Sequence, residues 1–155
     1  MLVRVLRRST PEEIEDRIKR FEKAYDMRFD EFEELLLTRK MASQSIDEYF
    51  EWADLVHAYR GYVESGELDY VVEEIYDLSF NELRALTSKR LELLHALSGL
   101  SVESINELAR KVHRDVKNVY QDLRVLNRLG LVNLKKRKRT IVPEALVEEI
   151  TFITR

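Results

Sequence analysis

The chain has 155 residues, of which 45% are hydrophobic and 35% are charged, so it is long enough for one domain or two small ones. It contains no cysteine, which excludes disulfides, thiolate metal sites and cysteine nucleophiles. No apolar run approaches the roughly 18 residues of a membrane-spanning helix, and the first residues lack the apolar core of a secretory signal. We therefore expect a cytoplasmic protein that does not contact a membrane.

Charge divides the chain into two parts. Residues 1–80 carry 11 Lys and Arg against 20 Asp and Glu, a net charge of −9, whereas residues 81–155 carry 15 against 9, a net charge of +6. The first part also holds 12 of the 14 aromatic residues. This asymmetry predicts an acidic helical module at 1–79 for dimerisation or partner binding, and a basic module at 80–155 for a polyanion.

Local signals place the secondary structure in chain order. A β-branched stretch at 2–6 predicts a strand, whose partner is either a hairpin near the end of the chain or the same strand of a second subunit. Helix starts are marked by a capping residue followed three positions later by glutamate, at Thr10/Glu13, Asp30/Glu33, Ser45/Glu48, Ser79/Glu82 and Ser104/Glu107. The resulting helices span about 11–25, 30–40, 46–65, 68–77, 80–86, 88–98, 104–112 and 116–129.

The expected helix 46–65 is apolar on several sides, so it must be covered on several sides. It is either the central core helix of the acidic module or an aromatic dimer interface. Glu51, Asp54 and His57 share one of its faces, but a metal site would need further ligands from other helices. No nucleotide-binding or hydrolase motif is present, and we expect no enzyme activity.

The expected helix 116–129 has two distinct faces. Val116, Val119, Leu123 and Leu126 recur at three- and four-residue steps and should face the core. The opposite side carries donors and acceptors suited to base edges in the major groove of DNA, and Arg114 precedes it where it could reach a phosphate. A solvated polar face is the alternative. The residues expected to contact DNA here are Arg114, Lys117, Asn118, Gln121, Arg124 and Arg128.

A basic hairpin is expected directly after this helix. Its strands are 131–134 and 139–142, Pro143 ends the second strand because proline lacks a backbone donor, and a last helix follows at about 144–151. Clustered cations at a hairpin tip favour contact with a phosphate backbone, although such a tip can also serve solubility alone. Five consecutive cations are expected to contact DNA: Lys135, Lys136, Arg137, Lys138 and Arg139.

These elements together predict a fold class that is mostly α. An N-terminal helical module is followed by a winged helix-turn-helix domain with a small β-hairpin wing.

The basic half also resembles a known family. The similar strings are LTSKRLELL at 86–94, INELAR at 105–110, RDVKNVYQDL at 114–123 and LGLV at 129–132. Over about residues 86–143 they resemble MarR-like winged-helix transcriptional regulators of archaea and bacteria, an antitoxin-associated family. The string RIKRFEKAYDMRFDEF at 17–32 resembles a segment of small archaeal antitoxin-like proteins. The resemblance implies dimeric operator binding through the long helix and the wing, without catalysis.

The sequence thus predicts a homodimeric, sequence-specific regulator of transcription that binds double-stranded DNA and needs no cofactor. Phosphate contacts from the wing, Arg114, Lys117 and Arg128 should supply most of the affinity, and Asn118, Gln121 and Arg124 most of the specificity. One alternative is an antitoxin that represses its own operon and neutralises a toxin through the acidic half. Two others are a metal-dependent enzyme and a winged helix that contacts only proteins.

Overall fold

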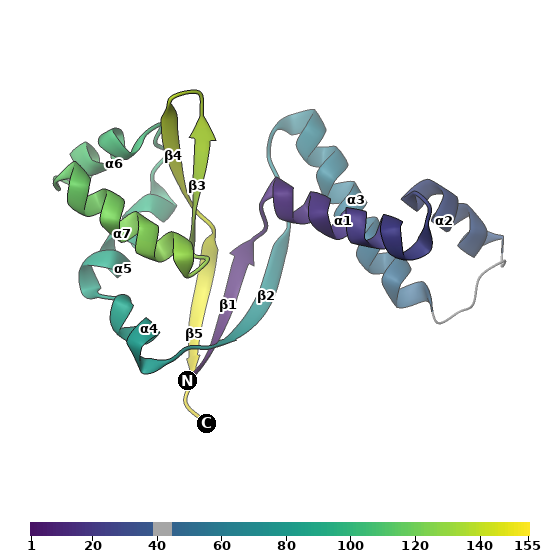
Figure 1. The fold of residues 1–155 in the computed structure, drawn as a ribbon, viewed down its shortest axis with the longest axis horizontal. Coiled ribbons are helices and arrows are strands. Elements are labelled where there is room, and N and C mark those ends of the chain that lie inside the picture. Colours follow the sequence, from purple (N-terminus) through teal and green to yellow (C-terminus); the bar gives the residue numbers. More distant parts are fainter. Residues whose placement is uncertain (39–44) are drawn as a thin grey trace. The chain divides into compact units, whose positions relative to one another are not determined.

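A computed structural model describes residues 1–38 and 45–155. The described residues form two compact units (Figure 1). One unit is residues 9–71, and the other combines residues 1–8 with residues 72–155. The first unit is therefore inserted into the second along the chain.

The unit of residues 9–71 contains three helices: α1 (Pro11–Tyr25), α2 (Phe29–Leu37) and α3 (Ile46–Ser65). α1 begins with the predicted capping box, in which the Thr10 side chain accepts from the Glu13 backbone and the Glu13 side chain accepts from the Thr10 backbone. α2 begins one residue before the predicted start, and residues 39 and 40 of that prediction lie outside the described residues.

Aromatic packing around Trp52 holds this unit together. Trp52 is fully buried on α3, and Phe21 stacks on its indole with ring centroids 5.3 Å apart. Phe32 and Phe29 of α2 pack on the same indole at 5.0 and 5.6 Å. Each aromatic pair adds about 0.5–1.5 kcal/mol beyond the area it buries, so Trp52 is the central core residue of the three helices.

The second unit contains four helices: α4 (Phe80–Ala85), α5 (Ser88–Gly99), α6 (Ile105–Lys111) and α7 (Val116–Arg128). A two-stranded hairpin, β3 (Val132–Arg137) and β4 (Thr140–Ala145), follows α7. Leu108, Leu123 and Leu126 are fully buried at the centre of the core. Side chains from α5, α6, α7 and the hairpin thus share one hydrophobic core.

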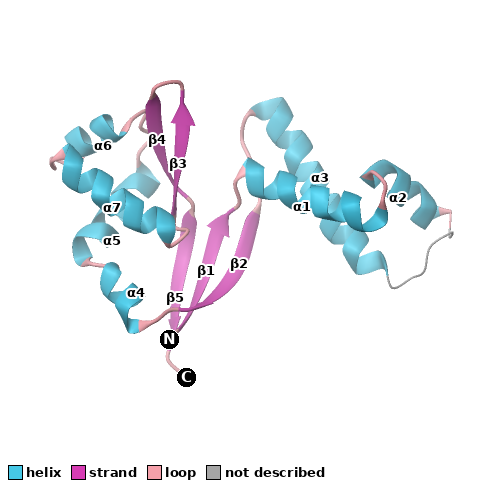
Figure 2. Ribbon diagram, viewed as in Figure 1, coloured by secondary structure: helices cyan, strands magenta, loops and turns pink. Residues whose placement is uncertain are grey.

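A three-stranded sheet completes this unit, built from β1 (Leu2–Arg8), β2 (Val71–Asp77) and β5 (Val147–Ile153). β1 lies in the middle, in the order β2-β1-β5 (Figure 2). It pairs antiparallel with β5, so that Val5 lies opposite Ile150. Val3 and Val5 are buried against the helical core. The open question of a partner for the first strand is therefore answered by β2 and β5, within the same chain.

The predicted fold class is wrong. The described chain is mixed α/β, with five strands in two sheets, rather than a helical module followed by a winged helix-turn-helix domain. The helix expected at 68–77 is replaced by strand β2 from Val71 on, and the helix expected at 144–151 is replaced by the end of β4 and most of β5. Both segments are rich in Val, Ile and aromatic residues, which favour a pleated surface, and both join β1, which is distant in sequence.

Two details of the hairpin and α7 also differ from the prediction. Pro143 does not end the second strand, because β4 continues to Ala145 with Pro143 opposite Leu134. A two-stranded ladder has free edges, where a missing N–H costs little. Val116 was expected in the core but is 41% exposed at the first position of α7.

Candidate nucleic-acid interface

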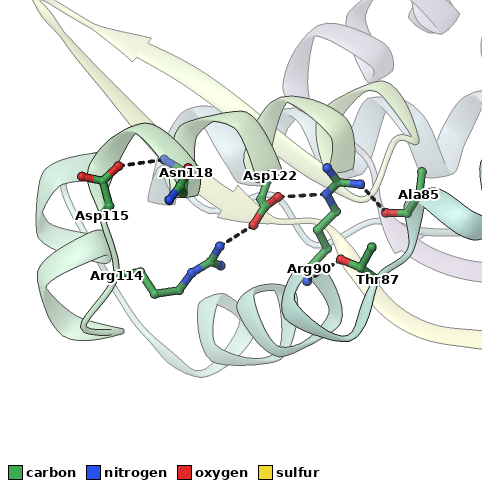
Figure 3. Close-up of polar contacts among 7 residues, drawn as sticks. All are labelled: Ala85, Thr87, Arg90, Arg114, Asp115, Asn118 and Asp122. Atoms are coloured by element: carbon green, nitrogen blue, oxygen red, sulfur yellow. Dashed lines mark hydrogen bonds and ion pairs between the residues drawn. The ribbon is translucent and has the colours of Figure 1, made fainter.

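A short turn joins α6 to α7 and fixes where α7 begins. His113 in this turn has a φ of 55°, a left-handed conformation that is common just after the end of a helix. Asp115 then caps α7, because its carboxylate accepts a hydrogen bond of 3.3 Å from the backbone N–H of Asn118 (Figure 3). A negative charge at a helix N-terminus also interacts favourably with the helix dipole.

The position of α7 is held by a cluster around Asp122. Its Oδ1 accepts from Arg90 Nε at 2.9 Å, and its Oδ2 accepts from Arg114 Nη2 at 2.6 Å. Arg90 donates further to the carbonyl of Ala85, at 2.8 Å. Figure 3 shows the three charged side chains meeting between α5, the α6–α7 turn and α7. The cluster therefore ties three segments to one carboxylate on the inner side of α7.

Arg114 is placed in this cluster rather than on the outer surface. Its side chain is 24% exposed and its Nη1 atom is buried without a hydrogen-bond partner among the described residues. The geometry therefore gives Arg114 a supporting role beneath α7. Asp122 had no part in the sequence-based site, because its pairing depends on Arg90, which lies 32 residues away.

α6, the helix before the turn, is stabilised at its own N-terminus. The hydroxyl of Ser104 accepts from the backbone N–H of Glu107 at 3.0 Å. The Glu107 carboxylate accepts from the backbone N–H of Glu103 at 2.8 Å, and this bond, together with Lys111, lowers the pKa of Glu107. The Glu107 carboxylate is therefore held in its charged form beside the helix start.

α7 separates an apolar face from a polar one. Val119, Leu123 and Leu126 are fully buried, as their spacing predicts. The five residues of α7 itself that were proposed for DNA contact lie on the solvent side, and every one is exposed: Lys117, Asn118, Gln121, Arg124 and Arg128. This exposed side supplies both cations and side-chain amides along one helix.

The hairpin presents its cations at a two-residue turn, Lys138–Arg139, between Arg137 and Thr140. Lys136 to Arg139 are exposed and Lys135 is partly buried. Lys138 has a φ of 52°, a left-handed conformation that glycine adopts more easily than lysine. A long cationic side chain thus occupies the position where a hairpin turn favours glycine or asparagine.

The cations of α7 and the hairpin differ in their ion pairing from several other cations of the same unit. Arg7, Arg90 and Lys111 each form an ion pair with a carboxylate. Within the described residues, Lys117, Arg124, Arg128 and the five hairpin cations form none. Residues 123–143 include seven Lys and Arg and no Asp or Glu. Their positive charge is therefore available to an external anion.

A groove of about 780 Å³ connects the start of α7 to the hairpin. Lys117 and Tyr120 line one side and Arg139 and Thr140 line the other, with Val116 and Ile141 also lining it. Ser104, Ile105 and Asn106 at the start of α6, together with the α7 cap residue Asp115, complete its lining. The sequence had indicated the two cations but not Tyr120, Thr140 or Asn106. The fold thus brings one cation of each predicted basic segment, Lys117 and Arg139, into the lining of a single groove.

Metal ligands and membrane-spanning helices were searched for among the described residues. Within residues 1–38 and 45–155, no three His, Asp or Glu side chains gather as a group that could hold a metal ion. No helix in this part of the chain is long and apolar enough to cross a bilayer.

Comparison with known protein families finds a similarity over part of the chain. The model of a family described as HVO_A0114 matches residues 85–152, which include α5 to α7, the hairpin and most of β5. No curated protein matches the chain. The matched stretch contains the whole exposed basic surface described above.

Proposed function

We propose that the chain is a sequence-specific DNA-binding regulator of transcription that acts as a homodimer. The observation that carries the proposal is the set of exposed cations on α7 and the hairpin that form no ion pair within the described residues, two of which, Lys117 and Arg139, line one groove. Clustered charges of one sign repel each other, and a DNA backbone would neutralise them while releasing counterions.

In this proposal, α7 enters the major groove of a duplex with its exposed side towards the bases. Asn118 and Gln121 offer amides that can pair with adenine, and Arg124 offers a fork that matches guanine. The hairpin cations and Lys117 contact phosphates, which fix orientation and supply affinity. Arg114 acts indirectly, by holding α7 through Asp122.

The homodimer part of the proposal rests on apolar side chains that the unit of residues 9–71 leaves exposed. Phe50 and Val63 of α3 are 59% and 68% exposed, and Leu37 of α2 is 72% exposed. Burying such side chains against a second copy would contribute about 25 cal/mol per Å². Sedimentation of the pure protein at micromolar concentration tests this. A dimer that dissociates in the Phe50→Lys variant supports the proposal, and a monomeric wild type contradicts it.

The central experiment selects duplexes from a random pool and then measures their affinity against salt concentration. We expect enriched inverted half-sites about one helical turn apart, and a log–log salt slope of about −4 to −8 per dimer. Gln121→Ala should cost about 1–3 kcal/mol at one base position. Equal loss on random DNA would instead make Gln121 a backbone contact, and a flat salt response would contradict DNA binding by these cations.

The alternative function is an antitoxin whose acidic unit binds a basic toxin. The unit of residues 9–71 carries 8 Lys and Arg against 17 Asp and Glu, a net charge of −9, which suits a cationic partner electrostatically. A small basic protein that co-purifies with the chain and is released by salt would favour this function. Such a partner is compatible with DNA binding by the other unit.

A further inference from the structure

The exposed side of α7 carries an aromatic–cation stack. The guanidinium carbon of Arg124 lies 5.9 Å from the centroid of the Tyr120 ring, one helical turn earlier. Tyr120 is 38% exposed, and Arg124 forms no ion pair within the described part of the chain. The tyrosine ring is therefore the group that the structure places against this guanidinium.

The tyrosine ring, rather than its hydroxyl, makes this contact. Tyr49, Tyr59 and Tyr76 each donate their hydroxyl to a glutamate. The hydroxyl of Tyr120 bonds to no described residue. Tyr120 thus contributes a flat surface to α7, at the border of the groove that runs to the hairpin.

A guanidinium reads guanine only when its planar fork is aligned with the base edge. An unrestrained arginine side chain loses about 2 kcal/mol of rotamer entropy when it is fixed. Stacking on an aromatic face restricts the side chain before binding, which reduces this cost. A phenylalanine at position 120 would provide the same surface, whereas a leucine would provide apolar area without a π face.

We propose that Tyr120 is a positioning residue that holds the Arg124 guanidinium in its base-reading orientation. The stack at 5.9 Å and the exposure of both side chains on the reading side of α7 carry this assignment. It rests on the proposed DNA-binding function, and it predicts that Tyr120 affects duplex binding only through Arg124.

A double-mutant cycle tests the assignment, using the full-length protein and a duplex selected from a random pool. Tyr120→Leu should weaken binding to that duplex about two- to fivefold, the usual range for an exposed cation–π contact. In the Arg124→Ala background, the same substitution should change affinity by less than about 1.5-fold. Tyr120→Phe should bind like the wild type, and the salt slope should stay constant because no phosphate contact is lost.

Three results would overturn the assignment. The first is a Tyr120→Leu loss that persists without Arg124, which would show a direct contact between Tyr120 and DNA. The second is a Tyr120→Phe loss equal to that of Tyr120→Leu, which would show that the hydroxyl acts. The third is a wild type that binds no duplex, which would overturn the proposed function as well.

A matched control exists in the other unit. The guanidinium of Arg17 stacks on Tyr70 with 5.7 Å from its carbon to the ring centroid. Tyr70→Leu removes an equivalent stack and should leave the duplex affinity unchanged. Thermal unfolding of each variant separates folding defects from binding defects, because Tyr120 lies outside the buried core.

Discussion

The Asp122 carboxylate accepts a hydrogen bond from Arg114 at 2.6 Å while its other oxygen holds Arg90 at 2.9 Å. One negative charge thus serves two guanidinium groups, whose side chains are each only 24% exposed. Removing the carboxylate leaves both cations in a poorly solvated site without their shared counter-charge.

Asp122→Ala should therefore lower the free energy of unfolding by about 2–4 kcal/mol, less than for a fully buried pair because water reaches part of the cluster. Urea denaturation measures this loss. Glu149→Ala is the matched control, since it breaks a pair with Arg4 in which both side chains are about half exposed; it should cost less than about 1 kcal/mol. Equal midpoints for Asp122→Ala and the wild type would contradict the supporting role of the cluster.

The exposed hairpin cations should set the salt dependence of DNA binding. Replacing Lys136 and Arg137 together by alanine should reduce the magnitude of the log–log salt slope by about 1–2 per protomer, because each phosphate contact contributes about 0.9. Binding to unrelated duplexes should weaken by a similar factor. The control is Lys23→Ala on α1 in the other unit, an exposed cation whose loss should leave the slope unchanged. An unchanged slope in the hairpin variant would mean that these cations do not contact phosphates.

Substitutions at Lys138 can distinguish an effect on stability from an effect on DNA binding. The φ of Lys138 is 52°, which is unfavourable for a lysine. Lys138→Gly relieves this strain and should raise the free energy of unfolding by up to about 1 kcal/mol. The same change removes a cation, so DNA affinity should fall. Lys138→Ala removes the charge but keeps the strain, and it should lose affinity without the gain in stability. A glycine variant that is less stable than the alanine variant would contradict backbone strain at position 138.

The lowered pKa of Glu107 predicts that this residue contributes to stability in an acid-sensitive way. Its pKa in the folded protein lies below the ordinary value of 4.5, chiefly because of the bond from the Glu103 backbone N–H. The unfolded chain therefore binds this proton more readily, so the contribution is present above about pH 4.5 and is lost as the pH falls through the lower folded value. Urea midpoints measured from pH 6 down to pH 3 should drop less steeply in Glu107→Gln than in the wild type. Parallel profiles would exclude this contribution.

Local signals predicted the start of a helix correctly where the capping residue and the glutamate three positions later bond to each other. The boxes at Thr10/Glu13 and Ser79/Glu82 are both confirmed by reciprocal hydrogen bonds. The box expected at Ser45/Glu48 does not form, because Ser45 makes no side-chain cap bond and the Glu48 carboxylate accepts from the hydroxyl of Tyr25 instead. A tertiary contact overrode the local pattern there.

The three-stranded sheet could not be read from local patterns. β1 pairs with residues about 150 positions away, with Leu2 opposite Ile153, and no short-range signal encodes such a pairing. Alternation within 71–77 was present, since Val72, Glu74 and Tyr76 lie partly buried between exposed neighbours. The faces of α7 were predictable because their period is local, apart from Val116 at its end. The role of Asp122 was not, because it depends on residues of another helix.

The backbone N–H of Ser9 donates to the carbonyl of Tyr70 at 2.9 Å, so the two ends of the 9–71 unit touch each other. Those ends lead directly into β1 and β2, which are neighbours in the sheet. Residues 9–71 are therefore an insertion in the chain between β1 and β2, two neighbouring strands of one sheet. We therefore expect the other unit to tolerate the replacement of residues 9–71 by a tight turn, or by another domain with adjacent termini.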